Sequence, residues 1–137
     1  GIKLFIPNNQ LTKYKKNDGN VITIGLDTQT VFYQPHNFFT GQNIQVMKHN
    51  LLNKYNALFL IPLIKIQMEK FNWGGNGATL GRLARTKIML PVNKKNKPDF
   101  EYMEQYIKNI TYKKINQYLN YLVDYILNIS LNHYMHN

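Results

Sequence analysis

The sequence predicts an α+β fold: a small twisted β-sheet domain, mixed or antiparallel, with packed helices, followed by a long C-terminal helix. Three observations predict it. Before residue 50, short runs are rich in β-branched residues or alternate polar and apolar residues, as strands do. After residue 53 the apolar residues follow helical spacing, and in the C-terminal part they form one stripe along a helix. With 137 residues, 44% of them apolar, the chain can build one core and no more than one domain plus an appendage.

Four short runs near the N-terminus are predicted to be strands. Residues 21–24 are β-branched throughout, which makes this the strongest of the four predictions. Residues 43–48 alternate polar and apolar side chains, as a half-buried strand does. The other two runs, 2–6 and 31–33, each end close to a proline, and residues 17–20 form a turn whose residues tolerate positive φ.

The middle of the chain is predicted to be mainly helical. Apolar positions from residue 53 to residue 71 partly fit helical spacing, and Asn53 can cap that helix. Pro62 is expected either to kink the helix or to mark its true start. After the glycine loop at 74–77, Thr79 can cap a short helix that ends at Arg85, and residues 87–90 are predicted to form a last strand before Pro91.

A long helix is predicted beyond Pro98. Acidic residues stand near its positive N-terminal end, and its apolar stripe consists of Tyr102, Tyr106, Ile110, Ile115, Leu119, Leu122, Ile126 and Ile129. A helix of this length usually packs on another helix as a coiled-coil-like pair. We therefore divide the chain into a domain at 1–97, which we expect to be truncated at its N-terminus, and a helical region at 98–137.

The positive charge lies almost entirely in the first of these regions. The net charge is +10; residues 1–97 hold fourteen Lys and Arg against three acids, whereas residues 98–137 hold three Lys against four acids. A concentrated positive field favours an anionic partner such as a phosphate backbone. The alternative is a coding bias, because fifteen of the seventeen basic residues are Lys and Asn occurs nineteen times.

The sequence lacks the residues that several classes of function require. The absence of cysteine excludes disulfides and thiolate chemistry and suits a reducing cytoplasm, where we expect the protein to reside. The motifs of a base methyltransferase, a nuclease metal site and a phosphate-binding loop are all missing. The pair His133 and His136 is better explained as a solvated chain end than as a metal site. We expect no catalytic activity, no cofactor, no metal and no membrane association.

If the anionic partner is double-stranded DNA, the candidate contacts fall on predicted loops and turns. Asn and Gln can pair with adenine and Arg with guanine, Lys can hold phosphates, and a tryptophan beside glycines can stack or wedge. The alternatives are a core role for the tryptophan, a solvated turn for the lysines, and an ion pair with Glu69 for the arginines. The candidates are Lys13, Lys15, Lys16, Gln42, Asn43, Asn72, Trp73, Asn76, Arg82 and Arg85.

The order of motifs over roughly 19–110 resembles the target recognition domain of a type I restriction-modification DNA specificity subunit. The motifs are residues 21–24, 31–35, 38–46, 56–60 and 87–91, followed by the helix after Pro98, which resembles the conserved spacer helix of that family. The sequence departs from the family at 26–30, where many relatives have a glycine-rich turn, and after about Tyr118.

The resemblance implies a function and a set of partners. A specificity subunit of this family carries two such domains, and each reads one half of a split DNA site. Antiparallel helices separate the domains and set the gap between the half-sites. The subunit brings methyltransferase subunits, and in some systems a restriction subunit, to the DNA; the helix can also form a homodimer. A competing hypothesis is a helical assembly or dimerisation module with only non-specific nucleic-acid contacts, and a third is a general RNA-binding domain.

Overall fold

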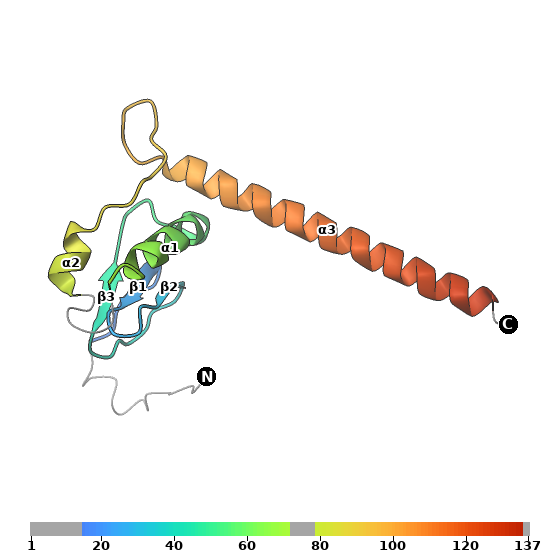
Figure 1. Cartoon of the computed structure of the whole chain (residues 1–137), viewed down its shortest axis with the longest axis horizontal. Coiled ribbons are helices and arrows are strands. Elements are labelled where there is room, and N and C mark those ends of the chain that lie inside the picture. Colours follow the sequence, from blue (N-terminus) through green and yellow to red (C-terminus); the bar gives the residue numbers. More distant parts are fainter. Residues whose placement is uncertain (1–14, 72–78, 136–137) are drawn as a thin grey trace.

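The computed structural model describes residues 15–71 and 79–135, with side chains to residue 131. In these ranges the elements follow the order β1 (Val21–Gly25), β2 (Val31–Gln34), β3 (Ile44–Met47), α1 (Lys54–Met68), α2 (Leu80–Arg85) and α3 (Phe100–Met135). Figure 1 shows a small sheet with α1 laid across it, and α3 extending far from this body. The predicted α+β fold with a long C-terminal helix is confirmed. The predicted strand at 2–6 lies outside the described residues.

The sheet is antiparallel, with the strand order β2-β1-β3. β1 is buried along its whole length, as expected for a central strand of β-branched residues. In its register, Ile22 is opposite both Tyr33 of β2 and Met47 of β3. Asn20 has a φ of 55°, which confirms the positive-φ turn that precedes the first strand.

α1 begins with a capping box. The Asn53 side chain accepts hydrogen bonds from the backbone N–H groups of Tyr55 and Asn56, and the Asn56 side chain accepts one from the Asn53 N–H. The predicted cap is therefore confirmed. The helix runs through Pro62, so the alternative that Pro62 marks its start is wrong. The capping box explains the difference, because it satisfies the amides of the first turn well before the proline.

The core lies between α1 and the sheet. Residues spaced three and four apart on α1 (Ala57, Leu60, Ile64 and Met68) are buried against the buried side chains of β1 and β2. Met103, in the first turns of α3, belongs to the same cluster and is fully buried. The start of the long helix is thus part of the hydrophobic core of the domain.

The strand predicted at 87–90 is not formed. Ile88 and Leu90 are half-buried against the core and Met89 is 93% exposed, but among the described residues the segment pairs with no strand. The alternation in the sequence reports one buried face, and an extended segment without ladder hydrogen bonds satisfies that pattern equally well. The segment ends in an isolated bridge between Val92 and Pro98.

The long helix begins at Phe100, and Asp99 caps it by accepting a hydrogen bond from the Tyr102 N–H at 2.9 Å. Its first two turns pack on α1: the rings of Tyr106 and Phe59 meet edge to face with centroids 5.5 Å apart. From Asn109 to Leu131 every side chain except Leu122 is exposed. None of the helices in the described part of the chain has the length and hydropathy needed to cross a bilayer.

Candidate functional site

Six of the ten predicted contact residues lie within the described ranges. Lys15 and Lys16 are exposed and precede an antiparallel bridge between Asn17 and Phe38. This bridge aligns the lysines with the segment that leads to Gln42 and Asn43. The other four candidates, Lys13, Asn72, Trp73 and Asn76, lie outside the described residues.

The turn before β3 presents Gln42 and Asn43. Both are exposed, and Asn43 has a φ of 61°, a left-handed conformation that asparagine tolerates better than most residues. The Asn43 side-chain amide donates a hydrogen bond to the Asp27 carboxylate at 2.7 Å, and its backbone carbonyl accepts one from Leu26. Asn43 therefore ties two loops together through its side-chain amide, and Gln42 is an exposed side chain of the same turn.

The two arginines belong to α2, whose N-cap is Thr79 as predicted. The Thr79 side-chain oxygen accepts a hydrogen bond from the Arg82 N–H at 3.3 Å. Arg85 is exposed and Arg82 is half-buried, so neither lies in a closed interior. In Figure 1, α2 lies beside β3, on the side of the sheet opposite β2. The arginines and the turn at 42–43 are thus carried by elements next to the same edge strand.

An apolar groove of about 280 Å³ separates α2 from the edge strand β3 and the end of α1. Its lining is mostly aliphatic, and it includes Val46, Met47, Ile64, Met68, Leu80 and Leu83. Leu83 packs against the core cluster, so α2 lies beside the sheet through an apolar contact that leaves this groove open.

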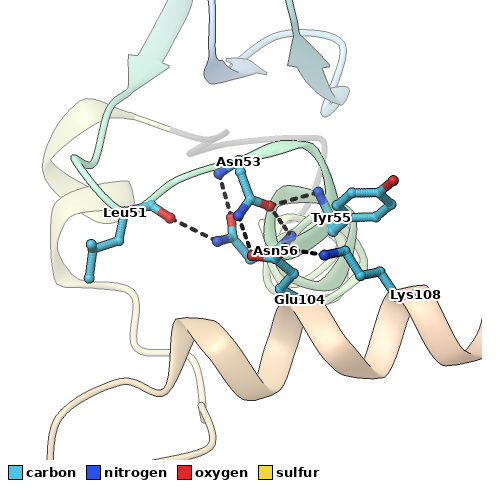
Figure 2. Close-up of polar contacts among 6 residues, drawn as sticks. All are labelled: Leu51, Asn53, Tyr55, Asn56, Glu104 and Lys108. Carbon is cyan, nitrogen blue, oxygen red and sulfur yellow. Dashed lines mark hydrogen bonds and ion pairs between the residues drawn. The ribbon is translucent and has the colours of Figure 1, made fainter.

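The residues that join the domain to the long helix were missed by the sequence analysis. Figure 2 shows them around the start of α1: the Asn53 side-chain amide donates to the Glu104 carboxylate at 2.6 Å, and Lys108 contacts the same carboxylate at 2.6 Å. The Lys108 ammonium also lies 5.0 Å from the centroid of the Tyr55 ring. The capping box and the Glu104–Lys108 spacing of four are visible in the sequence, but the link between residues 53 and 104 is not.

The charges of this junction stabilise each other. The hydrogen bond from Lys108 lowers the pKa of Glu104, and the hydrogen bond from Asn53 lowers it further. The same contact with Glu104 raises the pKa of Lys108. Both side chains are partly shielded from water, with 26% of Glu104 and 34% of Lys108 exposed. Across the neutral range the pair therefore stays ionised.

The described residues hold no group of three or more His, Cys, Asp or Glu side chains that could bind a metal ion. What the described surface offers instead is exposed amide, lysine and arginine side chains on loops and on one short helix, joined to a long helix with an exposed apolar stripe. Such an arrangement can bind and position a partner.

Comparison with known proteins identifies the class. The chain belongs to the family of type I restriction modification DNA specificity domains, whose sequence model matches residues 5–121. It is 35% identical over 91 residues to the type II restriction enzyme BgcI specificity subunit S.BcgI of Heyndrickxia coagulans. That match covers 66% of this chain and 26% of the relative, so the chain spans about a quarter of the relative's length. No solved structure matches it significantly. The resemblance stated from the motifs is confirmed.

Proposed function

We propose that the chain is the DNA sequence-recognition module of a restriction-modification specificity subunit. It reads one half of a split double-stranded DNA site, has no catalytic activity, and positions methyltransferase and restriction subunits that act on the DNA. The observation that carries this proposal is a small sheet-and-helix body with exposed basic and amide side chains on its loops, from whose core the long helix α3 extends. The family membership supports the same role.

The domain supplies two kinds of contact. Exposed lysines such as Lys15 and Lys16 neutralise phosphates, which gives affinity that falls steeply with salt and carries no sequence information. Gln42 and Arg85 have the donor geometry to distinguish adenine and guanine edges in the major groove. Both are exposed on loops or short elements beside β3, where the backbone can approach a duplex.

The long helix supplies the surface for the partners. Ile115, Leu119, Leu122, Ile126 and Ile129 alternate in steps of four and three, which is the spacing of a coiled-coil seam. Ile115, Leu119, Ile126 and Ile129 are between 50% and 59% exposed. A row of exposed aliphatic side chains of this length indicates an interaction surface. We propose that another helix covers the seam, from a second recognition domain of the parent protein or from a second copy.

Target-site profiling of the intact restriction-modification system tests the recognition role. Arg85→Ala and Gln42→Ala should each relax discrimination at one base position by about 1–3 kcal/mol, roughly 5- to 150-fold. Lys16→Ala should weaken binding to all duplexes alike and reduce the salt dependence. Lys113→Ala, an exposed lysine on α3, is the control and should change neither property. An unchanged base preference in both the Arg85 and the Gln42 variants would contradict the proposal.

The second candidate function, a helical assembly module with non-specific DNA contacts, is favoured by the exposed seam alone. Replacing Leu119 and Ile126 together by Gln separates the two functions. If the domain selects DNA sequence, the double variant should lose assembly in light scattering while keeping its base preference at one half-site. If assembly is the only function, the unsubstituted protein should show no base preference at all.

A further inference from the structure

The junction between the domain and α3 is held at several separate points. Met103 is buried in the core, the Phe100 ring stacks on His49 with centroids 4.5 Å apart, and Tyr106 meets Phe59. The fourth contact is polar and joins Asn53 to Glu104 and Lys108. The first three are apolar or aromatic contacts that tolerate some rotation. The polar contact is directional, because it needs a short hydrogen bond between specific atoms.

The Asn53 side chain is constrained on both of its polar atoms. Its Oδ1 accepts two backbone hydrogen bonds of the α1 cap, at 2.9 and 3.1 Å, and its Nδ2 donates to Glu104. Asn56, which is 1% exposed, completes the cap and donates to the Leu51 carbonyl at 2.8 Å. Figure 2 shows this chain of contacts running from the loop before α1 to the second turn of α3. Glu104 is thus held by a group that cannot rotate without breaking the cap.

A small rotation at this point has a large effect along the helix. Asn128 lies 24 residues beyond Glu104, which corresponds to about 36 Å at 1.5 Å per residue. A rotation of about 10° would move Asn128 by about 6 Å, which is close to two base pairs at about 3.4 Å each. The direction of α3 therefore determines how far apart two DNA sites can lie if they are held at the two ends of the helix.

We infer that Asn53, Glu104 and Lys108 are positioning residues that fix the direction of α3 and, through it, the number of base pairs between the two half-sites. This inference rests on the proposed function, because it needs a second half-site. The junction then helps to select the spacing between the half-sites, and this role is separate from base recognition. Helix length sets the coarse spacing, and the junction sets the tolerance around it.

Asn53→Asp is the sharpest perturbation, since Asp is as good an N-cap as Asn and keeps the acceptor that α1 requires. It replaces the donor facing Glu104 by a second carboxylate oxygen, so attraction becomes repulsion. Adding Glu104→Gln should restore the contact with reversed polarity, because the introduced glutamine amide can donate to the new carboxylate at position 53. Asn50→Asp adds the same charge at an exposed position nearby and is the matched control.

Spin-label distances test the direction of the helix without DNA. The chain has no cysteine, so Lys65→Cys on α1 and Asn128→Cys on α3, both exposed, accept labels specifically. We expect a narrow distance distribution in the doubly labelled chain without further substitution and in its Asn50→Asp variant. In Asn53→Asp it should broaden by about 6 Å, the displacement calculated above. The Asn53→Asp, Glu104→Gln double variant should be narrow again, and chains with one label give the contribution of self-association.

Selection from DNA libraries with varied spacing tests the consequence. In the intact system, Asn53→Asp should accept spacings that differ by one or two base pairs while keeping the bases of each half-site, and the double variant should restore the original spacing. An unbroadened distance distribution in Asn53→Asp would overturn the inference, and so would broadening with an unchanged spacing preference. If the unsubstituted protein selects no DNA sequence, the proposed function fails, and the label distances alone decide whether this contact directs the helix.

Discussion

Replacing Met103 by alanine measures how strongly the long helix is fixed to the domain. The Met103 side chain is fully buried in the cluster formed by α1 and the sheet. Removing its three outer heavy atoms leaves a cavity, and such a change in a core costs about 2–5 kcal/mol. A chain of this size has a free energy of unfolding of about 5–15 kcal/mol. The loss is therefore a large share of the total.

Urea denaturation gives the measurement. With a loss of about 3 kcal/mol and a slope of about 2 kcal/mol per molar urea, the midpoint should fall by about 1.5 M. Leu119→Ala removes the same number of heavy atoms from a residue on the same helix that is 51% exposed. Below the concentration at which the chain self-associates, it should change stability by no more than about 0.5 kcal/mol. Equal effects of the two substitutions would refute the conclusion that α3 is anchored by its first turns.

Two further predictions follow from contacts in the domain and at the junction. A Cβ at Gly19 would lie 2.5 Å from the Pro35 carbonyl oxygen, whereas a Cβ at Gly41 would have nothing within 4 Å. Gly19→Ala should therefore lower the free energy of unfolding by about 1–3 kcal/mol in thermal denaturation, and Gly41→Ala should leave it almost unchanged. Equal losses of stability in the two variants would contradict the packing at Gly19. Because Lys108 and then Asn53 lower the pKa of Glu104 below its ordinary 4.5, the stabilisation by this carboxylate is present above pH 4.5 and is lost as the pH falls through the lowered pKa. The Tm difference between the parent and Glu104→Gln should accordingly be largest near neutral pH and shrink in acid, and a constant difference would count against the contact.

Local signals predicted most of the elements because local contacts form them. The β-branched run of β1 needs only its own side chains to favour an extended backbone, and the caps at Asn53 and Thr79 act on amides two or three residues away. Each of these predictions depends on residues within one turn or one strand. Each is present in the structure within a few residues of its predicted bounds.

The errors and omissions arose where contacts between residues distant in the sequence determine the structure. The alternation at 87–90 is satisfied by burial of one face, and no local signal states whether another strand lies beside it. The contact between Asn53 and Glu104 joins residues 51 apart. Likewise, the sequence suggests strands but does not give their order, in which the first strand lies between the other two. The predicted contact residues remain predictions, since their pairing with bases depends on the DNA.

The long helix combines two regions with different sources of stability. Its first turns are held by the core, by aromatic contacts and by the polar junction, whereas beyond Lys108 its side chains contact little of the described domain. Most helical stability in proteins comes from the packing of an apolar face, so a helix that covers the seam would add stability to the region from Ile110 to Leu131. A partner would then hold the helix straight while the junction fixes its direction. Because a defined position of the far end requires both a fixed origin and a stiff helix, the spacing preference should broaden when either the seam or the junction is disrupted.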